Sequence, residues 1–422
     1  MPAQTFWVET LGCPKNQVDS DKLAGTMVAD GLVAAATASD ADVVVVNTCA
    51  FIESAREESV ATVLGLAELK APQARLVVTG CMAERYGAEL AEALPEVAQV
   101  AGFGVPVSFG RAPSSAPTGD VAKLDLLNLP RPPASAPWAY VKIAEGCDRH
   151  CGFCAIPSFR GRQRSRTPES ILAEVDALGA REIVLVAQDL ASYGRDDPAV
   201  GAGAIVALVE AVAARVARTR LLYLYPSDLS DALVDAIGAT GVAYFDLSLQ
   251  HVSRPLLRRM RRWGDGQRFL RRIEDIRTRW PDAAFRSNFI VGYPGETESD
   301  HDQLLAFLDG AQLDWCGFFS YSAEEGTHAA GLDGAVDPAL MAERLSELSE
   351  VQDAITARRR EALVGRTVEV LVDAPGVGRS HREAPEIDGV VRVPDSLPVG
   401  RTCPVLVTGA EGPDLDAVVP GG

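Results

Sequence analysis

A chain of 422 residues is longer than one ordinary hydrophobic core supports, so its length predicts two or three domains. Hydrophobic residues make up 47% and charged residues 23% of the chain, a balance that excludes disorder throughout and is typical of globular proteins. The formal net charge of -18 repels phosphate backbones at long range, which argues against free nucleic acid as a partner but leaves room for local basic patches.

The sequence predicts neither a secretory signal nor a membrane span. Its first ten residues, MPAQTFWVET, lack a basic start followed by an apolar stretch. The longest apolar stretch, residues 204–216, is too short for a bilayer and is interrupted by Glu210. We therefore expect a cytosolic protein. Its eight cysteines, in a reducing compartment, favour metal ligation or catalysis over a disulfide framework.

The first region, residues 1–110, alternates short apolar runs with segments of helical length such as residues 54–70. The runs predict strands buried on both faces, at residues 6–9, 43–46 and 76–78. This alternation is typical of a parallel α/β domain. Residues 111–137 are dense in Pro, Ala and Ser, which predicts an extended linker.

The second region, residues 138–362, repeats the alternation with six strand candidates and helices such as residues 168–178 and 296–308. The strand candidates lie at residues 139–143, 183–187, 221–225, 244–249, 285–291 and 317–320. They predict an open or incomplete (β/α)6 barrel, closed by a long charged helix at residues 338–363.

The last region, residues 363–422, turns to short β-rich pieces separated by Gly and Pro. The pieces lie at residues 368–372, 389–393 and 405–407. They predict a small antiparallel β-barrel of the oligonucleotide-binding type. The fold class is therefore α/β, with a β-barrel at the end of the chain.

Three cysteines directly follow the first strand candidate of the second region: Cys147, Cys151 and Cys154. Barrel active sites lie at the carboxyl ends of the strands, where this loop falls. Three thiolates on a four-iron cluster leave one iron without a protein ligand, and an open iron can bind and reduce a cofactor. The alternative is structural zinc, but zinc motifs pair cysteines in two knuckles or with two histidines, and no second knuckle follows. The spacing predicts a catalytic iron–sulfur cluster.

Three more cysteines, Cys13, Cys49 and Cys81, each come just after a strand of the first region. Parallel strands put their carboxyl ends along one edge of a sheet, so these sulfurs can converge on a second cluster. Burial as small hydrophobic residues is the alternative, but three cysteines at equivalent strand ends favour shared ligation. Cys316 and Cys403 have no matching partners, and we interpret both as packing residues.

The motifs around both cysteine sets resemble a known family over nearly the whole chain. They are TLGCPKNQVDSD, NTCAFIESAREES, VTGCMAERY, EGCDRHCGFCAIPSFRGRQRSR, VAQDLASYG, YPSD, LQHVSRPLLRRMRR and FIVGYPGETESD. Together they resemble the methylthiotransferase family of radical S-adenosylmethionine (radical SAM) enzymes. The pieces IPSFRG, VAQD and YPSD are similar to the branch of that family that modifies a ribosomal protein.

This resemblance implies a specific reaction: insertion of sulfur and a methyl group at the β-carbon of an aspartate in small-subunit ribosomal protein twelve, S-12, giving 3-methylthioaspartate. It implies two 4Fe-4S clusters and two molecules of S-adenosyl-L-methionine, one as methyl donor and one as radical source. Cys147, Cys151 and Cys154 would hold the radical SAM cluster, and the other trio an auxiliary cluster that carries the sulfur. The C-terminal barrel would be TRAM-like. Cofactors would supply the reactivity, and the protein would position the substrate.

The partners implied are the ribosomal protein, free or in the ribosome, a reductant and a sulfur donor, with no membrane partner and a monomeric enzyme. Gln188 and Asp189 end the second barrel strand, where enzymes similar to this one commonly contact the cofactor. The weaker cofactor-binding candidates, at or near later strand ends, are Ser227, Gln250 and Asn288. A satisfied loop hydrogen bond is the alternative for each. His251 could carry protons, but a lone His at a strand end is more often structural.

Two arginine runs have open interpretations. The first run follows the cluster loop: Arg160, Arg162, Arg164 and Arg166. It could bind the cofactor carboxylate or an acidic substrate, or it could be a solvated basic loop. The second run is equally ambiguous: Arg258, Arg259, Arg261 and Arg262.

Two other functions compete with the ribosomal one. The sister enzyme of the family methylthiolates an adenosine in transfer RNA, but an RNA-gripping barrel would be basic. Between residues 365 and 407 the chain has five arginines, no lysine and six acidic residues, which favours a protein substrate. The second alternative is a non-catalytic iron–sulfur or zinc protein that binds partners through its barrel.

Overall fold

The structure is a computed structural model that describes residues 3–107 and 125–421. The described chain forms two compact units. The first unit lies within Met1–Pro133, Ala144–Arg149 and Cys154–Arg166, and the second within Ala134–Ile143, His150–Phe153 and Thr167–Gly422. No helix of the described chain combines the length and apolar character that a bilayer crossing requires.

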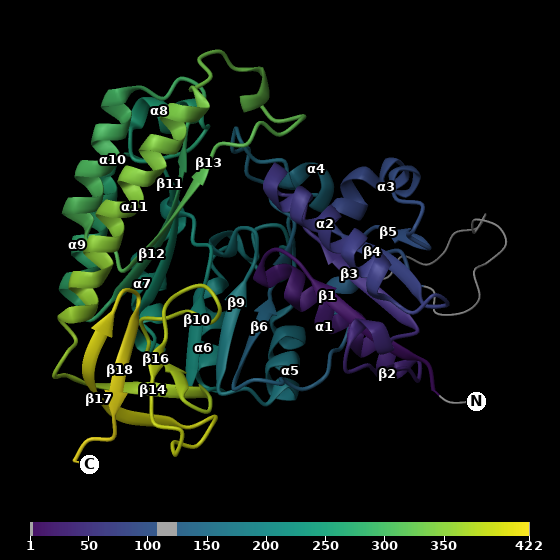
Figure 1. Cartoon of the computed structure of the whole chain (residues 1–422). Helices are drawn as coiled ribbons and strands as arrows, with labels where there is room; N and C mark the ends of the chain where they lie inside the picture. Colours follow the sequence, from purple (N-terminus) through teal and green to yellow (C-terminus); the bar gives the residue numbers. More distant parts are fainter. Residues whose placement is uncertain (1–2, 108–124, 422) are drawn as a thin grey trace. The chain divides into compact units, whose positions relative to one another are not determined.

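The first unit is built on a five-stranded parallel sheet of order β2-β1-β3-β4-β5 (Figure 1). Its strands are β1 (Thr5–Thr10), β2 (Val33–Ala34), β3 (Val43–Thr48), β4 (Arg75–Gly80) and β5 (Gln99–Ala101). Its helices are α1 (Pro14–Ala29), α2 (Glu53–Leu69), α3 (Cys81–Ala93) and α4 (Ile156–Arg160), with short turns η1 (Ala38–Asp40) and η2 (Leu126–Asn128). A small antiparallel pair, β7 (Ala144–Glu145) and β8 (Arg164–Ser165), completes the unit.

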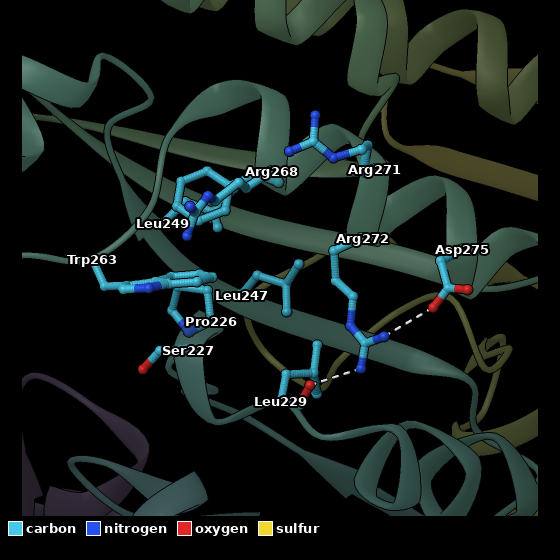
Figure 2. Close-up of a pocket in the computed structure, with 11 residues that line it drawn as sticks. Pro226, Ser227, Leu229, Leu247, Leu249, Trp263, Arg268, Arg271, Arg272 and Asp275 are labelled. Carbon is cyan, nitrogen blue, oxygen red and sulfur yellow. Dashed lines mark hydrogen bonds and ion pairs between the residues drawn. The ribbon is translucent and has the colours of Figure 1, made fainter.

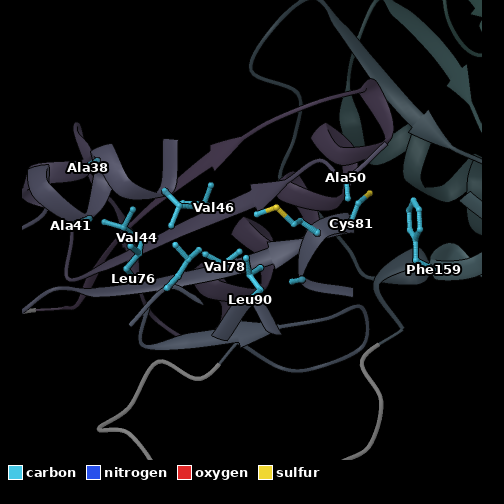
Figure 3. Close-up of a cluster of buried hydrophobic side chains, with 14 of the residues drawn as sticks. Ala38, Ala41, Val44, Val46, Ala50, Leu76, Val78, Cys81, Leu90 and Phe159 are labelled. Atoms are coloured by element: carbon cyan, nitrogen blue, oxygen red, sulfur yellow. The ribbon is translucent and has the colours of Figure 1, made fainter. Parts of the chain in front are cut away.

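The core of this unit lies on both faces of β3 and β4. Val44, Val46 and Val78 pack with α2 and α3 on one face, while Val45 and Val77 pack toward α1 on the other (Figure 3 shows the first of these faces). The expectation of strands buried on both faces is confirmed for β3 and β4. It is wrong for β1, most of whose residues are only partly buried, because its outer neighbour β2 has two residues.

The second unit carries six parallel strands in chain order. They are β6 (Trp138–Lys142), β9 (Glu182–Val186), β10 (Arg218–Leu221), β11 (Tyr244–Gln250), β12 (Ala284–Val291) and β13 (Trp315–Ser320). They form two three-stranded sheets, β6-β9-β10 and β11-β12-β13. One parallel bridge between Leu224 and Leu247 links the two sheets. Among the described residues no ladder joins β13 back to β6. The predicted open (β/α)6 barrel is confirmed (Figure 1).

Helices follow the strands of this barrel as the alternation predicted. They are α5 (Pro168–Leu178), α6 (Ile205–Ala213), α7 (Asp231–Ala239), α8 (Arg254–Arg259), α9 (Gly266–Arg279), α10 (Glu298–Ala311) and α11 (Pro338–Glu361), with turns η3 (Leu190–Ser192), η4 (Pro226–Asp228) and η5 (Ala329–Gly331). One predicted strand is misplaced: β10 begins at Arg218, whereas the apolar run predicted residues 221–225. Its first residues include the buried Arg218 and Arg220, so apolar runs could not reveal them.

The chain ends in a closed five-stranded barrel of order β14-β15-β16-β18-β17. Its strands are β14 (Thr367–Ala374), β15 (Val377–Arg379), β16 (Val391–Arg392), β17 (Thr402–Glu411) and β18 (Asp414–Val418). Val370, Val391, Val405 and Leu415 fill its core. The expected small antiparallel barrel is confirmed, with one exception, since β16 and β18 run parallel.

The β15–β16 loop of this small barrel covers the amino ends of the (β/α)6 strands. Three side chains from the starts of those strands donate to carbonyls of the loop region: Arg218 Nη1 to Arg379 O at 2.8 Å, Arg220 Nη1 to His381 O at 3.0 Å, and Trp315 Nε1 to Arg382 O at 2.6 Å. The amino end is therefore closed by the chain itself, which leaves the carboxyl end of the strands for chemistry.

Candidate active site

The first unit brings Cys13, Cys49 and Cys81 together at the carboxyl edge of its sheet. The strands that precede them, β1, β3 and β4, are neighbours in the sheet. Cys13 caps α1, Cys49 follows β3 directly, and Cys81 begins α3. The chain turns sharply before Cys13 at Gly12, whose φ is +94° and whose Cα faces the side chain of Cys49. The three strand ends that precede these cysteines are therefore adjacent at one edge of the sheet.

Burial and neighbouring charges shift the pKa of each of these thiols. Burial opposes the charged thiolate of Cys13, but Lys15, Arg160 and backbone amides outweigh it and lower the pKa of this thiol. Burial raises the pKa of Cys49 to about 12, and the neighbouring Cys13 and Cys81 add to that shift. Burial also raises the pKa of Cys81, against the pull of Arg160. The thiolate is therefore disfavoured at Cys49 and Cys81 by burial, whereas nearby cations favour it at Cys13.

Arg160 supplies a positive charge that favours thiolates at this edge of the sheet. It ends α4, and its guanidinium is buried within the first unit. Nη2 donates to Cys81 Sγ at 3.1 Å and to Asn16 Oδ1 at 2.6 Å, and Nη1 donates to Glu145 at 2.8 Å and to Asp19 at 3.4 Å. Burial opposes its charge, but Glu145, Cys81 and Asp19 raise the pKa of Arg160 above its usual range. A permanent cation thus lies against a cysteine of the trio.

Asn16 is a second polar residue at this edge. Its side chain is fully buried, and its Nδ2 donates to Leu11 O at 2.8 Å and to Thr48 O at 3.2 Å. These bonds tie the loop after β1 to the end of β3. Sequence reasoning missed Asn16 and did not assign Arg160 to this trio; the available signal for Asn16 was its place three residues after Cys13 in the CPKNQ motif.

The second trio lies along the loop that follows β6 and β7, and each of its cysteines is described within its own unit. Cys147 and Cys154 belong to the first unit and Cys151 to the second. All three are half-buried. In the first unit, the backbone N–H of Arg149 donates to Cys147 Sγ at 3.4 Å. In the second unit, the guanidinium of Arg262 donates to Cys151 Sγ at 3.2 Å.

Arg262 holds Cys151 from within the second unit. Its guanidinium lies 4.3 Å from the ring centroid of Tyr225 and also donates to Ser248 O at the end of β11. The neighbouring Gly152 is fixed by its own backbone, because its N–H donates to Met260 O at 2.8 Å. Each cysteine trio therefore has one thiol that accepts a hydrogen bond from a buried arginine, a donor suited to a thiolate.

The eight cysteines are all described, and they are thiols rather than disulfides. Within residues 3–107 and 125–421, no three His, Cys, Asp or Glu side chains stand close enough to hold a single metal ion. A four-iron cluster spreads its ligands over several iron atoms, so its thiolates stand farther apart than the ligands of one ion.

The polar side chains predicted to contact the cofactor lie after or within different barrel strands and differ in burial. Gln188 and Asp189 follow β9, and Asp189 is buried at the start of η3. Gln250 ends β11 with φ of +71°, a conformation uncommon outside glycine. Asn288 lies inside β12, three residues before its end. Ser227 is exposed in η4, where it lines a pocket against α9.

His251 is buried after β11, and burial lowers its pKa to about 4. Its Nδ1 accepts from the backbone N–H of Ser253 at 3.1 Å, which suits a neutral structural imidazole. Cys316 lies within β13 and Cys403 within β17, as their sequence positions predicted. Burial raises the pKa of the Cys316 thiol, which keeps it protonated.

The structure divides each arginine run. In the first run, Arg160 and Arg166 are buried, whereas Arg162 and Arg164 are exposed. In the second, Arg262 is buried and Arg259 donates to Pro294 O at 2.8 Å and pairs with Asp333, whereas Arg258 and Arg261 are exposed. The solvated-loop interpretation fits only the exposed members.

Three family models match the chain. They are described as Uncharacterized protein family UPF0004, over residues 5–102, the Radical SAM superfamily, over residues 141–308, and the TRAM domain, over residues 364–419.

Curated relatives match nearly the whole chain. The "Ribosomal protein uS12 methylthiotransferase RimO" of Saccharopolyspora erythraea is 43% identical over 457 residues, covering 96% of this chain and 93% of the relative. The protein of the same name from Moorella thermoacetica is 43% identical over 416 residues, covering 95% and 96%. Among solved structures, the radical S-adenosylmethionine methyltransferase TsrM from Kitasatospora setae, with cobalamin and a [4Fe-4S] cluster bound, is 13% identical with a TM-score of 0.47, covering 89% and 80%.

Proposed function

This chain belongs to the RimO family of ribosomal protein uS12 methylthiotransferases, radical SAM enzymes that use S-adenosylmethionine and 4Fe-4S clusters, and from that premise we propose its reaction. The enzyme inserts sulfur and a methyl group at the β-carbon of an aspartate of uS12 to give 3-methylthioaspartate. The observation that carries this proposal is the near-complete coverage of the chain by relatives of that one name. We further propose a cytoplasmic monomer that requires an external reductant and a sulfur donor.

Cys147, Cys151 and Cys154 hold the radical SAM cluster in this proposal. Their loop follows β6, the first strand of the barrel, in the chain, and the hydrogen bond from Arg262 suits a ligating thiolate at Cys151. Bound S-adenosylmethionine supplies the radical chemistry. The proposed cofactor contacts follow or lie near the ends of barrel strands: Gln188, Asp189, Gln250 and Asn288, with the exposed Ser227 as the weakest of them.

Cys13, Cys49 and Cys81 hold the auxiliary cluster. Support for this assignment comes from the adjacent strand ends, the effect of Cys13 and Cys81 on the pKa of Cys49, and the buried guanidinium of Arg160 against Cys81. A cluster bound by thiolates carries negative charge, so a permanent cation at 3.1 Å stabilises it.

A protein substrate is favoured because the C-terminal barrel offers little unpaired positive charge. Arg379 pairs with Asp373 and Glu182, and Arg382 and Arg366 pair with Asp282. Arg392 pairs with three acidic side chains: Glu411, Asp414 and Asp416. Only Arg401 of the five is exposed without an ion pair to the described residues. Such a surface lacks the excess cations that an RNA-gripping module uses.

Incubation of the anaerobically reconstituted enzyme with uS12 or with transfer RNA, followed by mass spectrometry of both, tests the substrate. We expect a gain of sulfur and methyl on an aspartate of uS12 and none on RNA; a gain on RNA alone would reject the proposal.

The ligand assignment is tested separately. Cys151→Ala should abolish formation of deoxyadenosine from S-adenosylmethionine while the iron and sulfide of the auxiliary cluster remain. Normal cleavage by this variant, or zinc in place of iron in the anaerobic protein, contradicts the assignment.

A further inference from the structure

An unassigned pocket of about 390 Å³ lies beside the carboxyl end of β11, on the side that faces α9 (Figure 2). Leu247 and Leu249 of β11 contribute apolar side chains, and Leu229 and Phe269 add to them from η4 and α9. Trp263 forms one side, with 43% of its surface exposed. The volume lies within the range of pockets that hold small organic groups, about 300–1,000 Å³.

Three arginines of α9 add positive charge to this pocket. Arg268 lies over the Trp263 ring at 5.5 Å from its centroid and also pairs with Asp265 at 3.4 Å, which fixes its planar guanidinium at the aromatic surface. Arg272 is held in place by Asp275 at 2.8 Å and by Leu229 O at 2.7 Å. Arg271 is exposed and forms no ion pair with the part of the chain that the structure describes. The pocket thus combines an apolar and aromatic lining with two guanidinium groups held by neighbours, Arg268 and Arg272, and one exposed guanidinium, Arg271.

The surrounding segment is strongly basic in an acidic protein. Residues 254–279 hold ten arginines, no lysine and three acidic residues, whereas the whole chain has a net charge of -18. Arg254, Arg258 and Arg261 are also exposed and without ion pairs to the described residues. Because the protein otherwise repels polyanions, this local concentration of guanidinium groups marks where a phosphate-bearing partner can approach.

We propose that this pocket binds an unpaired nucleotide of ribosomal RNA, with the base against Trp263 and Arg268 and the phosphate at Arg271. Aromatic rings and guanidinium planes stack on bases, and arginine recognises phosphate, so one nucleotide uses both halves of the pocket. This inference rests on the proposed function and deepens it: the enzyme docks uS12 in the RNA-containing small subunit rather than as a free protein.

The position of the pocket supports this role. Trp263 directly follows Arg262, whose guanidinium donates to Cys151 Sγ, and Ser227 and Pro226 of the pocket follow β10. The pocket therefore adjoins the carboxyl end of the strands, where barrel enzymes bind substrate. RNA bound there orients the subunit relative to this cysteine without touching the reacting groups.

The test compares binding and activity of the reconstituted full chain toward unmodified small ribosomal subunits and toward isolated uS12. Trp263→Ala combined with Arg271→Glu should weaken subunit binding about tenfold or more, because stacking and a phosphate contact are lost. The slope of log affinity against log salt should fall by about one. Activity on isolated uS12 and deoxyadenosine formation should stay within about twofold of the parent.

Two variants control for folding and for charge alone. Trp263→Phe keeps an aromatic face and should retain most of the subunit binding. Arg181→Glu changes an exposed arginine at the amino end of β9, also in the second unit, and should bind subunits as the parent does.

Unchanged subunit binding by the double variant, or an equal loss toward isolated uS12, overturns the inference. If an acidic peptide that contains no RNA displaces the subunit from the parent enzyme, the pocket binds a protein partner, and the inference is overturned as well. A parent enzyme that modifies neither form of uS12 would instead contradict the proposed function.

Discussion

At the scale of single residues, buried arginines distinguish the two cysteine trios from ordinary buried thiols. Arg160 donates to Cys81 and Arg262 donates to Cys151, and both guanidinium groups are largely removed from solvent. A buried cation is costly unless acidic or thiolate groups pair with it. In the proposed function these arginines belong to the two cluster sites, although their sequence runs look like solvated basic loops.

Arg160→Gln should lower the amount of auxiliary cluster that the protein retains. The change removes the donor to Cys81 and leaves Glu145 and Asp19 buried without their cation, at a cost of about 3 kcal/mol or more in the free energy of unfolding. Iron and sulfide content and the urea midpoint are measured in a Cys147/Cys151/Cys154→Ala background, where only the auxiliary site remains.

Arg162→Gln is the matched control for that experiment, because it changes an arginine two residues away whose side chain is 93% exposed. It should retain parental iron content and stability. Equal losses in both variants would show that Arg160 has no special relation to Cys81.

Arg262→Gln should weaken the radical SAM site while the protein stays folded. The change removes the donor to Cys151 and the cation over Tyr225. Hydrogen bonds to cluster sulfurs help set reduction potentials, so the potential of this cluster should become more negative. Redox titration followed by electron paramagnetic resonance, in a Cys13/Cys49/Cys81→Ala background, measures it; Arg258→Gln, at an exposed position of α8, should leave the potential unchanged.

At the scale of elements, the strand ends of the first sheet define where the cysteines meet. The glycine before Cys13 permits this approach, since Gly12 has φ of +94° and a Cβ added there would lie 2.9 Å from Cys49 Cβ and 3.0 Å from its Sγ. Distances below 3.0 Å require a neighbour to move, so the loop after β1 and the end of β3 are matched to each other.

Gly12→Ala should displace Cys49 and reduce auxiliary-cluster occupancy well beyond its effect on stability. Gly31→Ala provides a matched comparison, because Gly31 has φ of +88° but no atom within 4 Å of the added Cβ. Both changes carry similar backbone strain, about 1 kcal/mol, but only Gly12 faces a cysteine. Iron content per folded protein separates them, and equal iron content in the two variants contradicts the role of Gly12.

At the scale of the whole molecule, buried ion pairs connect the two barrels of the second unit at the amino end of the (β/α)6 strands. Glu182, the first residue of β9, is fully buried among Arg218 and Arg220 of β10 and Arg379 of the C-terminal barrel. Burial raises its pKa, but Arg220, Arg379 and Arg218 outweigh burial and lower the pKa to about 2. One carboxylate thus joins two barrels that the sequence suggests as separate pieces.

Glu182→Gln should destabilise the protein by about 3–5 kcal/mol, because three arginines lose their buried counter-ion. The folded pKa of Glu182 is depressed from 4.5 to about 2, so its contribution to stability is present above pH 4.5 and is lost as the pH falls toward 2. The free energy of unfolding of the variant should therefore change less with pH between 4.5 and 2 than that of the parent. Urea midpoints measured from pH 5 to pH 2.5 check this, with the exposed Glu369→Gln as control.

The sequence by itself determined the order of strands and helices, the open barrel, the small C-terminal barrel and the family, which the comparisons confirm. These features depend on local patterns: apolar runs for β3 and β4, a helix start at Pro168, and cysteines placed at strand ends. Adjacent parallel strands turn such local positions into neighbours in space, so the adjacency of the strand ends before Cys13, Cys49 and Cys81 could be predicted.

Only the tertiary structure decided which polar and charged side chains are buried. Arg160 and Arg162 are indistinguishable in the sequence, yet one lies against Cys81 and the other in solvent. The start of β10 is misplaced because Arg218 and Arg220 are buried against Glu182 and against carbonyls 161 residues away. Burial of a charge depends on counter-ions supplied by distant segments, and a local pattern carries no information about them.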